Sequence, residues 1–230
     1  MHVLAIDTST AQVAVAIGED HSVKGEIRLV GGRRHAEQLA PAIALLVEST
    51  GIRLDHLAAI AVGIGPGMFT GLRVGVTTAK TMAQALRIPV VPVASLDLVA
   101  YPVRHTSRVV VATIDARRRE VFHASYRPVP GGIQRITDYA VASPADLVAE
   151  LDAHGEEVLL AGDGVATAPE LFGALEHAEL AGPEFELPSV AALVALAGAR
   201  VEREDFSQPW DVVPLYLRES DAELSWNIAR

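Results

Sequence analysis

The sequence predicts an α/β protein made of two related subdomains, each with a mixed sheet flanked by helices. Short apolar segments with strand character alternate along the chain with segments of helical periodicity, which indicates sheets covered on both faces. The two halves also begin alike. Asp7 and Asp115 each end an apolar strand, and a second strand resumes six residues later, at Val13 and Val121. We interpret this repeat as a duplication.

The first half is predicted to contain five strands and two helices. Apolar residues 3–6 and 13–17 flank a polar turn and predict a hairpin, and residues 22–30 continue as a more polar third strand. Helical periodicity then covers 33–50, where Pro41 is expected to bend the helix and Gly51 to end it. A buried strand at 57–64, a glycine-rich turn, a helix at 69–87 and a buried strand at 89–94 complete this half.

The second half repeats this plan. It is predicted to contain strands at 109–114, 120–126 and 133–141, a helix, a strand at 158–161, and helices near 169–177 and 190–202. The segment 101–108 contains Pro102 and has no clear periodicity, so it is the expected boundary. We therefore predict an N-terminal subdomain at 1–104, a C-terminal subdomain at 105–218 and a tail at 219–230.

The composition excludes several classes of protein. With 19 Lys and Arg against 29 Asp and Glu, the 230 residues carry a formal net charge of −10, which argues against a role that rests on gripping nucleic acid alone. Half of the residues are apolar and none is cysteine, so we expect a large core without disulfides, thiolate nucleophiles or cysteine-ligated metals. The chain starts without a cationic segment, and its longest uncharged stretch is broken by glycines. We expect a cytoplasmic protein with no membrane association.

A glycine-rich segment at 63–75 follows a buried strand and opens a helix. Glycines in this position can let backbone N–H groups cradle an anion. The segment nevertheless fits neither the P-loop pattern nor the full dinucleotide fingerprint, because Lys, Ser/Thr and the later acidic residue are not where phosphate chemistry needs them. A structural turn is the favoured interpretation, ahead of phosphate binding.

Small residues recur at four-residue spacing within the second helix, at Gly71, Gly75, Ala79 and Ala83. Two interior glycines each cost about 1 kcal/mol of helix stability relative to alanine, which the close approach of another backbone could offset. That backbone could belong to the chain's own sheet or first helix. Because the helix is apolar on more than one side, we favour a partner protein.

Two polar turns are candidates for anion binding. Residues 7–10, Asp-Thr-Ser-Thr, place an acid and hydroxyls at a hairpin tip, where some nucleotide-binding proteins face phosphates and metal. These are also ordinary turn residues, which is the favoured interpretation. The matching turn at 115–120 lacks a glycine, and its three arginines are expected to form surface ion pairs or a protein contact.

The sequence contains no recognisable catalytic or metal motif. No two of its eight histidines have the four-residue spacing that places both imidazoles on one helical face, and no G-x-S-x-G is present. These absences favour a protein that is not an enzyme.

Five motifs, taken together, resemble those of the TsaB family, also called YeaZ. They are LAIDTS at 4–9, RHAEQLAP at 34–41, the glycine-rich segment with TGLR at 70–73, DARR at 115–118 and PLYLR at 214–218. The resemblance covers nearly the whole chain. It implies an actin-like ATPase (ASKHA) fold and a non-catalytic role beside TsaD and TsaE in the machinery that forms N6-threonylcarbamoyladenosine next to the anticodon of tRNA.

The resemblance can be carried onto individual residues. TsaD-type sequences have a His-x-x-x-His metal motif where this chain has Ser95 and Val99, so neither a metal site nor catalytic residues are expected. No cofactor is expected, although weak nucleotide binding stays open. The family associates through its first two helices, as a homodimer alone or as a heterodimer with TsaD, and meets tRNA only through the complex. The predicted partner interface comprises His35, Leu39, Ile43, Leu46, Gly71, Leu72, Gly75, Val76, Ala79 and Ala83.

Three other functions are consistent with parts of this pattern. An ASKHA-fold phosphotransferase would need a glycine in the second turn, where Arg117 and Arg118 stand instead. A metal-dependent glycopeptidase-like enzyme would need the missing histidine pair. A free-standing homodimer with a separate role would use the same two helices.

Overall fold

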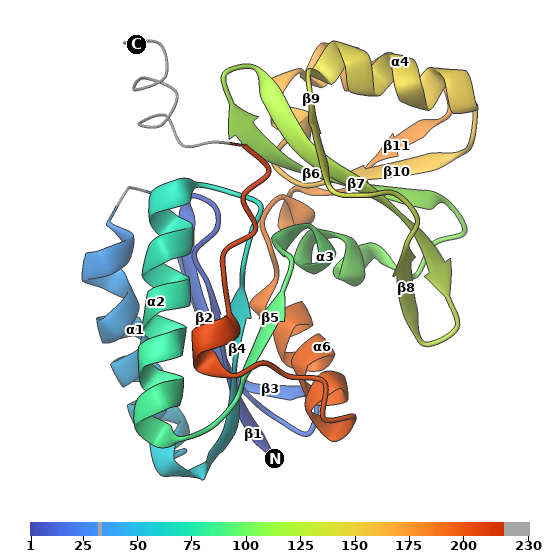
Figure 1. Cartoon of the computed structure of the whole chain (residues 1–230). Helices are drawn as coiled ribbons and strands as arrows, with labels where there is room; N and C mark the ends of the chain where they lie inside the picture. Colours follow the sequence, from blue (N-terminus) through green and yellow to red (C-terminus); the bar gives the residue numbers. More distant parts are fainter. Residues whose placement is uncertain (32–33, 219–230) are drawn as a thin grey trace.

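The computed structural model describes residues 1–31 and 34–218, which form two sheets side by side (Figure 1). The predicted helix start at Arg33 and the predicted tail at 219–230 lie outside the described residues. The first sheet has the strand order β3-β2-β1-β4-β5. Its strands are β1 (His2–Asp7), β2 (Gln12–Glu19), β3 (Ser22–Val30), β4 (Leu57–Gly63) and β5 (Val90–Val93).

Helices cover both faces of the first sheet. The strands β1, β2 and β3 pair antiparallel, while β4 and β5 join β1 in parallel. Side chains alternate between the two faces of a strand. In β1, Leu4 and Ile6 pack with helices α1 (His35–Thr50) and α2 (Phe69–Leu86), whereas Val3 and Ala5 pack with α6 (Val190–Glu202). The face toward α6 is rich in alanine, which allows this helix to lie close to the sheet.

The second sheet has the order β11-β10-β6-β7-β8, with β9 beside β7. Its strands are β6 (Val109–Arg117), β7 (Glu120–Val129), β8 (Gly132–Arg135), β9 (Ala140–Ala142), β10 (Val158–Ala161) and β11 (Ala178–Leu180). One face packs against α4 (Pro144–His154) and α5 (Pro169–Gly173) through Leu147, Leu151 and Phe172. The other face packs against α3 (Ser95–Ala100) through Leu96 and Val99.

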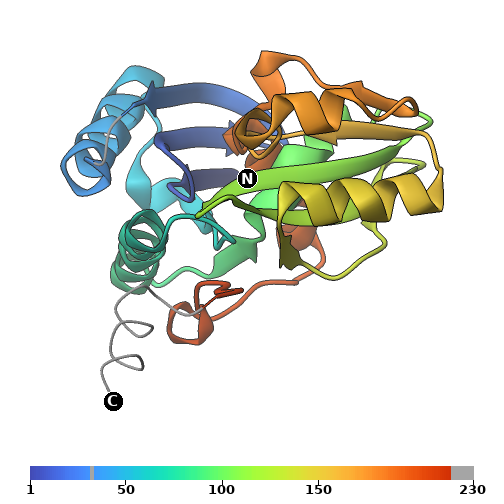
Figure 2. The ribbon, with the colours of Figure 1, turned by 90° about the horizontal axis from the view of Figure 1, so that it is seen from above.

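The packing does not follow the predicted division at residue 104. Helix α3 precedes that boundary but packs on the second sheet, and α6 follows it but packs on the first. The chain then continues along the first sheet, where Ser207 pairs with Val90 and the short turn η5 (Pro209–Asp211) contacts α2. Figure 2 shows the two halves from above, with α1 and α2 at one end of the molecule and α4 at the other.

Two predicted elements differ most in extent, and α3 and β11 have no counterpart among the predicted elements. The segment 133–141 is not one strand, because the chain leaves the ladder between β8 and β9, where the Thr137 hydroxyl accepts a hydrogen bond from the Ser125 N–H. The helix expected near 169–177 ends at Gly173 in the structure. Within residues 1–31 and 34–218, no helix combines the length and apolar character needed to cross a membrane.

Candidate functional site

The end of β1 places the carboxyl group of Asp7 inside the protein. Its oxygen Oδ1 accepts hydrogen bonds from the Ser9 N–H at 3.2 Å and the Ser9 hydroxyl at 3.0 Å. The hydroxyl of Ser95, at the start of α3, donates to Oδ2 at 3.3 Å. A Cβ atom at Gly63 would stand 1.9 Å from Oδ2, so β4 needs a glycine there. The side chain is fully enclosed by the chain itself.

This enclosure changes the proton affinity of Asp7. Burial raises the pKa of its carboxyl group to about 6, and the hydrogen bonds from Ser9 and Ser95 and the nearby His35 oppose that rise. Loss of hydration favours the neutral form of an acid, whereas donors and positive charge favour the anion. Asp7 is therefore a buried acid whose pKa lies well above the ordinary value of 3.8.

The small-residue stripe of α2 faces the chain's own β1–β2 turn. Added Cβ atoms at Gly71 and Gly75 would stand 2.1 Å from the Thr8 carbonyl oxygen and 2.3 Å from Thr8 Oγ1. Farther along the helix, Ala79 and Ala83 are buried against the first sheet. The explanation of this stripe as a surface for a partner is wrong, because the backbone that approaches it closely belongs to the same chain.

All ten residues predicted to form the partner interface are buried within this chain. His35, for example, holds the β1–β2 turn, with its Nε2 at 2.8 Å from the Thr10 carbonyl oxygen. Leu39, Leu46 and Val76 belong to the core under the two helices. Nearly all of these side chains point to the inner sides of α1 and α2, so a contact with a partner would rest mainly on other residues of the same helices. Helical periodicity identified the residues that share a face but not what covers that face.

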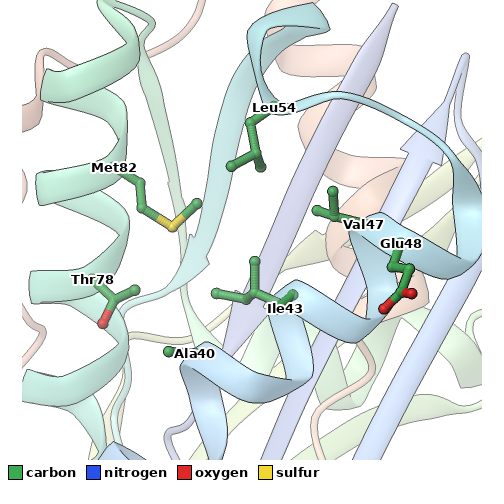
Figure 3. A pocket seen from close by; sticks show the side chains of 8 residues that line it. Ala40, Ile43, Val47, Glu48, Leu54, Thr78 and Met82 are labelled. Carbon is green, nitrogen blue, oxygen red and sulfur yellow. The ribbon is translucent and has the colours of Figure 1, made fainter.

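An apolar groove lies on the outer side, between α1 and α2 (Figure 3). It encloses about 560 Å³ and opens to solvent. Ile43, at 6% exposure, is the one predicted interface residue that reaches it. The full lining consists of Ala40, Ile43, Ala44, Val47, Glu48, Leu54, Thr78 and Met82.

The matching turn of the second half is held by a second acid, which is partly buried. Asp163 accepts a hydrogen bond from the Asp115 N–H at 2.9 Å, and burial raises the pKa of Asp163 to about 6. Arg117 pairs with Asp115 at 2.9 Å and places its Nη2 at 3.9 Å from the Met68 sulfur, just before α2. The predicted ion pair of this turn is thus confirmed for Arg117, which also connects the two halves.

The C-terminal segment at 212–218 crosses from one half to the other, which no pattern in the sequence predicts. The Leu215 N–H donates to the Ile64 carbonyl oxygen at 2.7 Å, and Leu217 packs in the core of the second half. Arg218 donates to Glu120 at 2.6 Å and to the Ala116 carbonyl oxygen at 2.9 Å. The PLYLR motif therefore holds the two halves together.

The described part of the chain contains no group of three or more His, Asp or Glu side chains arranged to hold a metal ion. Ser95 instead bonds to Asp7 and accepts the Gly65 N–H at 3.1 Å, and Val99 is a core residue. Both side chains therefore stabilise the chain's own structure.

Two mixed sheets with this connectivity, each flanked by helices, define an actin-like ATPase fold. The activator of 2-hydroxyisocaproyl-CoA dehydratase from Clostridium difficile shares it, with a TM-score of 0.51 at 10% identity, over 89% of this chain and 98% of that one. YeaZ from Pseudomonas aeruginosa is far more similar, with a TM-score of 0.81 at 29% identity over 94% and 99% of the two chains.

The family model described as "TsaD: tRNA N6-adenosine threonylcarbamoyltransferase" matches residues 25–226. The TsaB biosynthesis protein of Bacillus subtilis is 29% identical, with 98% of each chain covered. An uncharacterized protein of Mycobacterium leprae is 39% identical over 96% of this chain, which spans 56% of that longer relative. The chain belongs to the TsaB (YeaZ) family, and the resemblance carried by its five motifs is confirmed.

Proposed function

We propose that this chain is a non-catalytic subunit in the biosynthesis of threonylcarbamoyladenosine in tRNA, and that it docks on its catalytic TsaD relative through the groove between α1 and α2. The family supports the pathway, since three relatives at 29% identity are named tRNA threonylcarbamoyladenosine biosynthesis protein TsaB. The groove is the observation that carries the docking role.

The interior of the molecule supports a non-catalytic role. Ser95 and Val99, at the positions where the resemblance would place metal ligands, are both buried and engaged in the chain's own structure. Asp7, the acid that would face phosphates in a nucleotide-binding relative, is surrounded by Ser9, Ser95 and Gly63. This arrangement supports the expectation that the chain uses neither a nucleotide nor a metal as a cofactor.

The groove supports docking because its lining is apolar yet open to solvent. The lining residues Val47, Leu54 and Met82 are only partly buried. Leu45, which follows the lining residue Ala44 on α1, is 54% exposed. Covering such surface with a partner's apolar side chains stabilises a complex by about 25 cal/mol per Å² removed from water. Glu48 at the rim adds a polar edge, as protein interfaces usually have.

The remaining partners follow from the family resemblance. We expect a heterodimer with TsaD, with TsaE as a third component, and a homodimer when the chain is alone. In this scheme tRNA reaches the chain only through the complex, in the cytoplasm. The net charge of −10 supports the expectation that the isolated chain has little affinity for tRNA.

Size-exclusion chromatography with light scattering tests this proposal, using the full chain with and without purified TsaD. The proposal predicts a complex with TsaD that replaces the homodimer, and threonylcarbamoylation of a tRNA transcript that requires both proteins and TsaE. The proposal would be contradicted if the homodimer persisted in the presence of TsaD and the modification reaction did not need this chain. That outcome would favour a separate role for the homodimer.

A further inference from the structure

The β6–β7 turn carries three consecutive exposed arginines in an unusual backbone conformation. Arg117, Arg118 and Arg119 have φ angles of 62°, 54° and 63°, in the left-handed region that residues other than glycine seldom adopt. Each such residue costs of order 1 kcal/mol or more, and such positions concentrate at functional sites. The turn thus places three arginines at one tip of the molecule, with Arg117 ion-paired to Asp115, at a cost that a glycine would have avoided.

This turn is continuous with an aromatic surface at the start of α2. Arg117 contacts Met68, and the next residue, Phe69, lies 5.0 Å from the ring of Tyr216. Arg73 stacks over Phe69 at 3.9 Å, and its Nε lies 3.4 Å from the Tyr216 hydroxyl. The side chain of Tyr216 is 43% exposed. The arginine turn of the second half therefore lies beside a cluster of Arg73 and two aromatic rings.

We propose that Arg117, Arg118, Arg119, Arg73, Phe69 and Tyr216 form an RNA-binding surface, on which the arginines contact backbone phosphates and the rings receive an unstacked base. The inference rests on the proposed function, because the RNA would be a tRNA held in the complex with TsaD. The surface lies at the N-terminal end of α2, whereas the groove on which TsaD would dock is lined farther along the helix, by Thr78 and Met82.

RNA fits this surface better than an acidic protein does. Guanidinium forks match phosphate oxygens, and unpaired bases of RNA loops stack on aromatic side chains and on arginine planes. The aromatic and cationic groups occur here together, which an acidic protein segment would not require. The formal charge of −10 on the whole chain means that the contact strengthens binding only when another subunit holds the RNA nearby.

The test measures the affinity of the complete complex for an unmodified tRNA transcript, by fluorescence anisotropy over a series of salt concentrations. Arg118→Gln/Arg119→Gln removes two charges without touching the Arg117 contacts. A matched control, Arg127→Gln/Arg135→Gln, removes two charges on β7 and β8, roughly 25 Å along the sheet from the turn. Complex formation with TsaD is measured on every variant by light scattering. A complex formed by the wild type shows that the docking part of the proposed function holds.

We expect the turn variant to bind tRNA about 10-fold more weakly, with the salt dependence of log affinity reduced by about 1 to 2, while the control binds as the wild type does. Tyr216→Leu should also weaken tRNA binding. Its effect should persist at high salt, because base stacking is less sensitive to salt than ionic contacts are. An intact complex with unchanged tRNA affinity and salt dependence would overturn the inference. Loss of TsaD binding by the turn variant would also overturn it, and would make the arginines a protein contact.

Discussion

Thr8 lies directly beneath Gly71, and its hydroxyl donates a hydrogen bond of 2.7 Å to the Gly71 carbonyl oxygen. One turn later, a Cβ atom on Gly75 would stand 2.3 Å from the same Thr8 oxygen. The β1–β2 turn therefore packs tightly against α2, and Gly71 and Gly75 leave the space that this turn occupies. This contact fixes the position of the helix that forms one side of the groove.

Gly75→Ala should destabilise the protein, although alanine is the better helix former. The added methyl group overlaps the Thr8 hydroxyl, and overpacking of this kind costs about 1–3 kcal/mol. Thr8→Ala removes the overlapping atom, so the double variant should lose less stability than the two single variants together. Urea denaturation measures all three, with Gly173→Ala as the control because nothing lies within 4 Å of a Cβ at that glycine. If the stability losses of the two single variants simply added in the double variant, the overlap with Thr8 would not be the cause of the destabilisation.

Gly75→Leu extends the same argument. Because the stripe faces the core, the bulky side chain should impair folding, and any loss of TsaD binding should follow the loss of folded protein. Circular dichroism and light scattering on the same sample compare the two effects. A well-folded Gly75→Leu variant that fails to bind TsaD would return the stripe to the interface.

The sequence was sufficient where periodicity decides the structure. It predicted α6 with the observed bounds and α2 to within one residue, because long apolar patterns carry these two helices. The bounds of the more polar strand β3 also agree with the prediction. Periodicity could not show which partner a face meets. The stripe of α2 has the spacing expected of any close helix contact, and Thr8, 63 residues before Gly71, is brought to it only by the sheet. The exchange of α3 and α6 between the halves is likewise set by packing distant in sequence.

Asp7 should make the protein less stable as the pH rises from about 4 to about 6. Its pKa is higher in the folded chain than the ordinary 3.8, so folding favours the protonated form, and this contribution is lost as the pH passes the folded value. The difference between about 6 and 3.8 corresponds to about 3 kcal/mol. Asp7→Asn imitates the neutral acid, so it should be at least as stable as the wild type at pH 7.

Urea denaturation at pH 4.5 and pH 7 measures this effect. Asp7→Asn should show a smaller change between the two pH values than the wild type, and the raised pKa of Asp163 accounts for a remaining change in the same direction. Asp7→Ala should be destabilised at both pH values, because it leaves the hydroxyls of Ser9 and Ser95 without their acceptor. An identical pH dependence in Asp7→Asn and the wild type would refute the assignment.

His21, in the β2–β3 turn, should form a small pH-dependent link to α6. Its Nε2 lies 2.7 Å from Glu202 Oε1 and its Nδ1 lies 3.4 Å from the Ala195 carbonyl oxygen, so both nitrogens face acceptors. The Glu202 carboxylate raises the pKa of His21, and the resulting stability is present below about pH 6.5 and lost as the pH rises through the folded value. An NMR titration should give a lower pKa for His21 in Glu202→Gln than in the wild type. Equal values would remove the link.

The isolated chain should neither hydrolyse ATP nor modify tRNA. Asp7 is enclosed and Ser95 is committed to it, so no acid is free to hold a metal nucleotide at this turn. A coupled assay of ATP turnover on the purified chain measures this directly. Turnover by the wild type that disappears in Asp7→Asn would favour a phosphotransferase instead.

Docking of TsaD in the groove between α1 and α2 is tested most directly by placing a charge there. Ala44 lines the groove and is exposed, so Ala44→Arg introduces a cation without disturbing the core. Ala149→Arg makes the same change on exposed α4 of the other half. Burying a charge in an apolar contact costs several kcal/mol, and a pair with Glu48 one turn away would offset only part of that cost. The affinity of Ala44→Arg for TsaD should therefore fall at least about 10-fold by calorimetric titration, with unchanged melting temperature. Ala149→Arg should bind normally. Wild-type affinity in a folded Ala44→Arg variant would contradict docking in the groove.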